Sequence, residues 1–71
     1  MSKKLLTRSE LAEFISQARG DVVTVDQVIG NEKRWGLNLA RRDLNKRVIR
    51  YDLVIAEREL VSKEVIPAPP A

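Results

Sequence analysis

Apolar residues recur at helical spacing along the first part of the chain. The first such set is Leu11, Phe14, Ile15 and Ala18. It follows Thr7-Arg-Ser-Glu10, which fits a capping box: the threonine oxygen and the glutamate side chain each accept a hydrogen bond from a backbone amide of the first turn. Gly20 can adopt the left-handed conformation that ends a helix. We therefore predict a helix over about residues 7–19.

A second capping box follows after a short link. Thr24 and Gln27 have the same three-residue spacing, and Val23 and Val28 flank them as a hydrophobic staple. The helix should begin at Val25. Glycine costs about 1 kcal/mol inside a helix, so Gly30 is a weak point, and Gly36 is the better stop signal. We predict a helix over about residues 25–35.

The pattern over residues 37–46 has two interpretations. Leu37, Ala40 and Leu44 fit one face of a helix, whereas Asp43-Leu-Asn-Lys46 suits a turn in which Asn45 tolerates a positive φ. We favour the turn, and with it a two-stranded β-wing over about residues 39–51. Ile49 and Tyr51 share one face of the second strand and should face the core, with Val48 and Arg50 on the other face.

A third helix is predicted over about residues 53–64. Asp52 can serve as its N-cap. Its apolar stripe contains Leu53, Ala56 and Leu60, which either close the core or leave surface for a protein partner or for self-association.

The two ends of the chain lack such patterns. Residues 1–5 are expected to form a flexible basic arm. Residues 66–71 include Pro67, Pro69 and Pro70 and are expected to form a flexible tail. The folded domain should therefore cover residues 6–65.

Composition narrows the possible classes of function. The chain has 71 residues, with neither cysteine nor histidine, so disulfides, thiolate metal sites and the commonest general base are excluded. No carboxylate cluster suggests catalysis, and we expect no enzyme, no cofactor and no metal. No apolar run approaches the ~20 residues of a membrane span, so we expect a cytoplasmic protein without membrane contact.

Positive charge is concentrated in the middle of the chain. Residues 31–50 contain seven basic and two acidic residues, a net charge of +5, in a chain whose total is +3. Such a cluster is typical of a surface that neutralises phosphates. The alternative is a solvated surface with ion pairs such as Arg42 with Asp43.

Several single residues also have two interpretations. Gln27 can pair with adenine or complete the capping box, and Asn31 can contact a base or help to end a helix. Trp35 could stack on a base, but we expect it to pack in the core. Arg50 should lie on the outer face of its strand unless it pairs with Asp52.

Two segments carry a resemblance to a known family. The opening helix Leu6-Thr-Arg-Ser-Glu-Leu-Ala12 and the segment Arg47-Val-Ile-Arg-Tyr-Asp52 resemble the corresponding parts of small winged-helix proteins of the phage excisionase and MerR-like group. The resemblance covers roughly residues 5–62. It implies a mainly α fold with a small β-hairpin, in which the second helix enters the DNA major groove and the wing contacts the adjacent backbone or minor groove.

The resemblance also implies a function. A bacterial or phage-encoded, nucleoid-associated protein of this kind would bind double-stranded DNA and direct site-specific recombination or regulate transcription of a mobile element, in contact with a recombinase or with further copies of itself. The charge cluster and the resemblance together identify the candidate DNA contacts. They are Thr24, Val25, Asp26, Gln27, Asn31, Lys33, Arg34, Arg41, Arg42, Lys46, Arg47 and Arg50.

A hypothesis of a different class is a protein-interaction module, such as a small phage-type inhibitor or an adaptor. In that case the basic face would meet an acidic protein surface and the last helix would dock into a groove.

Overall fold

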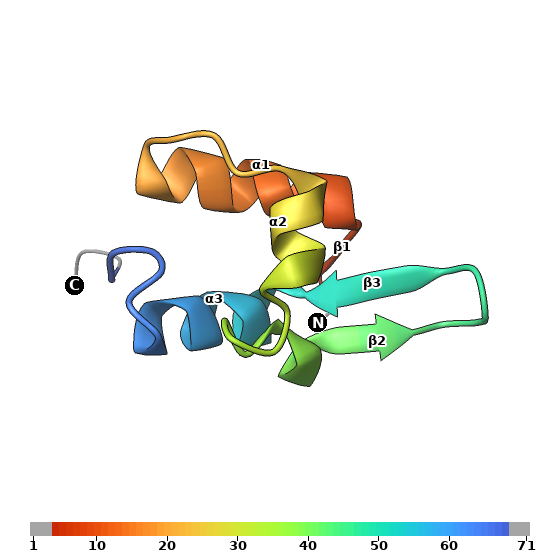
Figure 1. Ribbon diagram of the computed structural model, residues 1–71. Coiled ribbons are helices and arrows are strands. Elements are labelled where there is room, and N and C mark those ends of the chain that lie inside the picture. Colours follow the sequence, from red (N-terminus) through yellow and green to blue (C-terminus); the bar gives the residue numbers. More distant parts are fainter. Residues whose placement is uncertain (1–3, 69–71) are drawn as a thin grey trace.

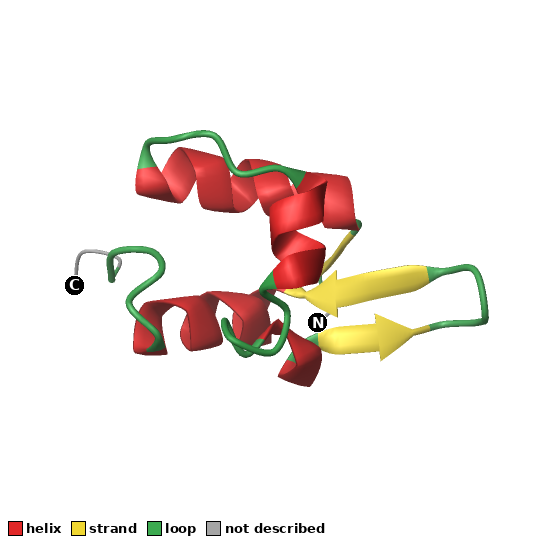
Figure 2. Ribbon diagram, viewed as in Figure 1, coloured by secondary structure: helices red, strands yellow, loops and turns green. Residues whose placement is uncertain are grey.

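The structure, a computed structural model, describes residues 4–68, and this part of the chain combines three α-helices with a three-stranded antiparallel sheet (Figure 2). In chain order the elements are β1 (Leu5–Leu6), α1 (Arg8–Arg19), α2 (Val25–Gly30), the 3-10 helix η1 (Leu37–Leu39), β2 (Arg41–Asp43), β3 (Ile49–Asp52) and α3 (Leu53–Ser62). The predicted combination of three helices with a hairpin is confirmed, and strand β1 is an addition to it.

The first helix begins and ends where its local signals predict. The Thr7 side-chain oxygen accepts a hydrogen bond from the Glu10 amide (3.1 Å), and Glu10 Oε1 accepts one from the Thr7 amide (2.9 Å). Gly20 has a φ of +84°, and its amide donates to the Ser16 carbonyl. The predicted capping box and stop signal of α1 are both confirmed.

The link between α1 and α2 is held by Ser16. Its hydroxyl accepts a hydrogen bond from the Val23 amide (2.8 Å) and donates to the Ala12 carbonyl (2.7 Å). Val23 itself is buried. The start of α2 is therefore tied to the body of α1, a contact that the sequence analysis did not predict.

The second helix is shorter than predicted. Its capping box between Thr24 and Gln27 is confirmed, but α2 ends at Gly30 rather than at residue 35. The Asn31 side chain and amide both donate to the Gln27 carbonyl (2.9 and 3.0 Å), which satisfies that carbonyl without a further helical turn. With the low helix propensity of Gly30, this ends the helix early, and residues 31–36 form turns instead.

The predicted hairpin forms, with different boundaries. Residues 37–39 belong to η1, so β2 starts at Arg41 rather than at Leu39. Arg41, Arg42 and Asp43 lie opposite Tyr51, Arg50 and Ile49.

The turn of the hairpin differs from the prediction in its conformation. The prediction of a positive φ at Asn45 is wrong, because in the described chain Glu64 is the one non-glycine residue with a positive φ. Asn45 instead uses its side-chain oxygen, which accepts hydrogen bonds from the amides of Arg47 (2.8 Å) and Val48 (2.9 Å). The residue still shapes the turn, through its side chain.

A strand that the sequence analysis placed in a flexible arm completes the sheet. Leu5 and Leu6 lie opposite Asp52 and Tyr51, and the Leu53 amide donates to the Lys4 carbonyl (3.1 Å). Strand β3 is thus central, in the order β1-β3-β2. The expected arm is therefore wrong for Leu5, and residues 1–3 lie outside the described residues.

The core lies where the three helices meet one face of this sheet. Its fully buried larger side chains are Leu11, Ile15, Val28, Leu37, Tyr51 and Leu60. Ile49 and Trp35 are half-buried and pack against them, which confirms the inward face of β3 and the placement of Trp35 in the core. The buried Tyr51 hydroxyl accepts a hydrogen bond from Arg8 Nε (3.3 Å).

Helix α3 begins as predicted and ends two residues early. Asp52, only 3% exposed, is the N-cap, and its Oδ1 accepts a hydrogen bond from the Ile55 amide (3.2 Å). Glu64 then has a φ of +61°, and the Val65 amide donates to the Leu60 carbonyl. The following Ile66, expected in the flexible tail, is buried; residues 69–71 of that tail lie outside the described chain.

The stripe of α3 faces inward. Ala56 and Leu60 are fully buried in the core and Leu53 is half-buried. Of the two alternatives for this stripe, closing the core is the one that Ala56 and Leu60 adopt, and neither side chain is accessible to a partner. None of the helices within residues 4–68 has the length and apolar character needed to cross a membrane.

The hairpin projects from the helical body. Figure 1 shows α1 and α3 on either side of α2, with the strands β2 and β3 extending to the right, away from the helices. The chain between β2 and β3 lies at the far end of this projection. The basic residues of the hairpin are thereby carried away from the core.

Candidate nucleic-acid interface

The pleat of the hairpin sorts its arginines onto two faces. Successive side chains of a strand point to opposite sides, and residues directly opposite each other share a side. Arg41 and Asp43 lie opposite Tyr51 and Ile49, on the side of the core. Arg42 and Arg50 lie opposite each other on the other side, which we call the outer face of the hairpin.

On the core side, the charge of Arg41 is met within the protein. Its Nε lies 2.7 Å from Asp43 Oδ1, and its Nη1 lies 3.2 Å from Glu32 Oε1. The hydrogen bonds to Asp43 and then to Glu32 raise the pKa of Arg41 above its ordinary value. This network joins β2 to the turn after α2, so Arg41 is suited to positioning the hairpin rather than to contacting a phosphate.

On the outer face, the two arginines have no carboxylate partner. No ion pair formed within residues 4–68 includes Arg42 or Arg50. Arg42 Nη1 donates to the carbonyls of Leu39 (3.2 Å) and Arg41 (2.9 Å), and Arg50 Nη1 donates to the Ile49 carbonyl (2.9 Å). Both of the alternative ion pairs, Arg42 with Asp43 and Arg50 with Asp52, are absent: Asp43 pairs with Arg41, and Asp52 caps α3.

Four further cations are exposed. Lys46 and Arg47 lie in the turn of the hairpin, and Lys33 and Arg34 lie in the turn after α2. None of the four takes part in an ion pair within the described chain. With Arg42 and Arg50 they make a set of six cations, which we call the basic surface; it comprises the outer face of the hairpin, the turn of the hairpin, and the turn after α2, which contacts the core side of the hairpin through Glu32.

Two of the candidate base-reading residues, Gln27 and Asn31, form hydrogen bonds at the ends of α2. Gln27 Oε1 accepts a hydrogen bond from the Thr24 amide (2.8 Å), and Asn31 Nδ2 donates to the Gln27 carbonyl. Val25 is half-buried against the core, and Asp26 is exposed. Pairing of Gln27 with adenine, which needs its amide oxygen and nitrogen together, would require it to leave the capping box.

A hollow of about 400 Å³ lies beside this helix. It is lined by Ile29, Gly30, Glu32, Lys33, Asn38 and Arg41. Ile29, Gly30, Glu32 and Asn38 were not among the residues predicted for the site. Glu32 is the important omission, because it links Arg41 to the turn after α2, and no local pattern in the sequence joins residues 32 and 41.

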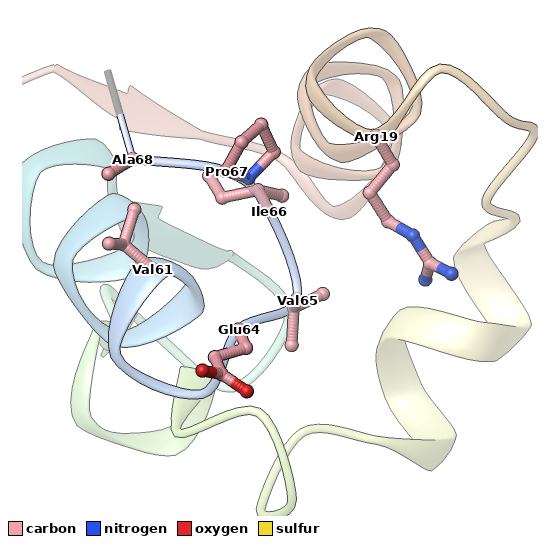
Figure 3. A pocket seen from close by; sticks show the side chains of 7 residues that line it. All are labelled: Arg19, Val61, Glu64, Val65, Ile66, Pro67 and Ala68. Carbon is pink, nitrogen blue, oxygen red and sulfur yellow. The ribbon is translucent and has the colours of Figure 1, made fainter. Parts of the chain in front are cut away.

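A second hollow, of about 520 Å³, lies between the end of α1 and the segment that follows α3. Figure 3 shows its lining, formed by Arg19, Val61, Glu64, Val65, Ile66, Pro67 and Ala68. Arg19 pairs with Asp21 (Nε to Oδ1, 3.3 Å). The lining brings together no nucleophile and base, and it contains none of the candidate residues.

Acidic groups are likewise dispersed. Over residues 4–68 no three side chains of the metal-binding types lie close enough together to hold an ion. Comparison with models of known protein families, with curated proteins and with solved structures finds no match.

Proposed function

We propose that the protein is a non-enzymatic, DNA-binding protein with a winged helix-turn-helix, in which α1 and α2 form the helix-turn-helix and the β2–β3 hairpin is the wing. It would act as an excisionase-like accessory or regulatory factor on double-stranded DNA in the cytoplasm. The recombination or transcription role rests on the resemblance of the opening helix and of the Arg47–Asp52 segment to that family.

The observation that carries DNA binding is the basic surface. Six cations that form no ion pair with the described part of the chain lie on the projecting hairpin and on the turn after α2. Cations that are already paired within a protein gain little from a phosphate, whereas unpaired cations release condensed counterions from DNA when they bind. The ion pairs formed within residues 4–68 involve Arg19, Arg41 and Lys63, which lie outside this set.

The conformation of α2 points to limited sequence discrimination. The helix has six residues, and the amide groups of Gln27 and Asn31 are used at its two ends. Contacts to the backbone position a protein on DNA, and base-edge contacts supply specificity. We therefore expect binding that is dominated by phosphate contacts, with a modest preference for particular sites.

A titration of fluorescent duplex DNA at several salt concentrations tests the proposal. Contacts to several phosphates predict a decrease in affinity of about tenfold or more between about 50 and 200 mM salt. Absence of binding to any duplex at low salt would exclude the proposed function and favour a protein-interaction module.

A pair of matched variants locates the contact surface. Replacement of Lys46 and Arg47 by alanine should weaken binding to all sequences alike and reduce the salt slope by roughly one for each phosphate that the variant no longer binds. The control is replacement of Arg58 and Lys63 by alanine, which removes the same charge from α3 and its C-terminal end. Equal decreases in affinity in the two double variants would show that overall charge, not the basic surface, determines binding.

A further inference from the structure

The register of the hairpin places two arginines directly opposite each other. Arg42 and Arg50 are paired across β2 and β3. Residues paired in this way have Cβ atoms about 4.5–5.5 Å apart, and like charges in such a pair destabilise a sheet. The free protein thus retains an unfavourable pair where a threonine or an opposite charge would stabilise the hairpin.

Neither arginine forms an ion pair within residues 4–68, and the nearby carboxylate charge offsets the pair only in part. Asp52 shares the face of Arg50 by alternation, but it is buried and its carboxylate accepts a hydrogen bond from the first turn of α3. Glu10 is close enough for Arg50 to contribute to the lowering of its pKa, but the main cause is its hydrogen bonding with Thr7. The carboxylates around the outer face are therefore committed to helix caps.

The pair also retains hydrogen-bond donors. A guanidinium carries five N–H donors in a planar fork that matches an oxyanion. In Arg42 and in Arg50, only Nη1 donates within residues 4–68, and its acceptors are backbone carbonyls close in sequence. These bonds hold both half-buried side chains against the hairpin and leave Nε and Nη2 for a ligand. The carbonyls of Arg41 and Ile49 point away from the opposite strand, so in the free protein the two guanidinium groups are turned toward opposite edges of the hairpin, and a shared ligand would draw them together.

We propose that Arg42 and Arg50 together bind a single phosphate of a nucleic-acid backbone on the outer face of the hairpin. This inference rests on the proposed function and adds a geometry to it: the backbone lies along the outer face of the sheet, and the turn with Lys46 and Arg47 is an additional contact. A phosphate between the two guanidinium groups relieves their repulsion, so the free energy by which this repulsion destabilises the unbound hairpin is recovered on binding. Arg41, on the opposite side, takes no part.

The first experiment measures the site without DNA. Thermal unfolding of the wild type, R42Q, R50Q and R42Q/R50Q is followed as inorganic phosphate replaces chloride at constant ionic strength. We expect phosphate to raise the Tm of the wild type and to raise that of each single variant much less. Without phosphate, each single variant should melt above the wild type, because the like-charge pair is gone. An equal response to phosphate in all four proteins would overturn the inference.

The second experiment measures duplex binding by the same four proteins. A shared phosphate predicts that each single substitution lowers the salt slope by about 0.9 and that the double substitution lowers it little further. The decreases in affinity should be strongly non-additive. Additive decreases, with a slope change about twice as large in the double variant, would mean two independent contacts and would overturn the inference.

The two experiments separate this inference from the proposed function. One outcome is that phosphate raises the Tm of the wild type but not that of R42Q or R50Q, while the wild type does not bind duplex DNA. This outcome would support the oxyanion site and exclude DNA as its ligand. Another outcome is that duplex binding depends on salt and that the two substitutions lower the affinity additively. This outcome would support the proposed function and exclude the shared site. If a glutamine variant fails to fold, R42K/R50K serves instead: it keeps both charges without the planar forks, so its response to phosphate should still fall.

Discussion

Helices α1 and α2 begin in the same way and end differently. Both have a threonine N-cap whose oxygen accepts from the amide three residues later, and both have a side chain at that position that returns to the cap. Yet α1 has 12 residues and α2 has 6. A capping box specifies where a helix starts, and the length of the helix depends on what competes for its last carbonyls.

The competition is visible at the two ends. After α1 the chain reverses at once through Gly20 in the left-handed conformation. After α2 the Asn31 side chain shares the carbonyl of Gln27 with the Asn31 amide, and the next amide, of Glu32, donates to Ile29 instead of Val28. Residues 31–36 form turns, and the left-handed glycine comes only at Gly36. Substitutions at the glycines of these two segments test this comparison.

The largest effect is expected for Gly36→Ala. Gly36 has a φ of +75°, and a Cβ there would lie 2.7 Å from Glu59 Oε1 and 3.0 Å from Glu59 Cβ. The left-handed conformation alone costs a non-glycine residue about 1–2 kcal/mol, and displacement of Glu59 adds to this. We expect a decrease of about 2–3 kcal/mol in the free energy of unfolding, measured by urea denaturation. Glu59→Ala in the same chain should restore part of the lost free energy of unfolding. If it restores none, the Glu59 side chain moves away from the new Cβ at no cost, and the close approach does not contribute to the destabilisation.

Gly20→Ala should have a smaller effect. Gly20 has a φ of +84°, but no atom lies within 4 Å of the position that a Cβ would take. The decrease in the free energy of unfolding should therefore be the conformational cost alone, about 1–2 kcal/mol by the same measurement. A decrease as large as that of Gly36→Ala would show that the proximity of Glu59 is unimportant.

Gly30→Ala should have the opposite sign. Gly30 lies at the end of α2, has no positive φ and has open space around the position of a Cβ. Alanine at a helical position is more favourable than glycine by roughly 0.5–1 kcal/mol, so the free energy of unfolding should rise. A decrease in the free energy of unfolding would contradict our explanation that the low helix propensity of Gly30 and the hydrogen bonds of Asn31 end α2 at this point.

The smallest effect concerns pH. The box of α1 contains a glutamate and that of α2 a glutamine, so only the first can titrate. Hydrogen bonding to Thr7 lowers the pKa of Glu10, so the carboxylate form of the cap is present above the ordinary value of 4.5 and is lost as the pH falls through the lowered pKa. In an NMR titration the Thr7 amide resonance should move below pH 4.5 and the Thr24 amide should not. Movement of both would indicate general acid unfolding, and Glu10→Gln should abolish the Thr7 response alone.

Local signals account for the parts of the fold that could be predicted from the sequence. The starts of all three helices depend on side chains within three residues, and Thr7, Thr24 and Asp52 each cap as expected. The inward face of β3 follows from alternation along one strand. What the sequence analysis missed depends on residues that are brought together by the fold. Strand β1 has two residues, too few for a periodic pattern, and its partner is near the other end of the chain.

The candidate site shows the same division. The positive charge of residues 31–50 can be counted in the sequence, but its distribution cannot. Pairing of Arg41 with Glu32 requires the turn after α2 to lie against β2, and the opposition of Arg42 and Arg50 requires the register of the hairpin. The sequence alone assigned these three arginines the same role. In the structure Arg41 pairs with carboxylates of the protein, whereas Arg42 and Arg50 form no ion pair within residues 4–68 and are available to a ligand.

The position of strand β1 also determines which end of the chain is suited to a label for binding assays. Lys4 lies beside the sheet, because its carbonyl accepts a hydrogen bond from the amide of Leu53, whereas the segment that follows α3 lies on the other side of the helical body from the hairpin (Figure 1). A fluorophore or affinity tag joined ahead of Met1 would be only three residues from Lys4, beside the strand that carries Arg50, where it would crowd a bound ligand. Labels and surface attachments for binding assays belong after Ala68.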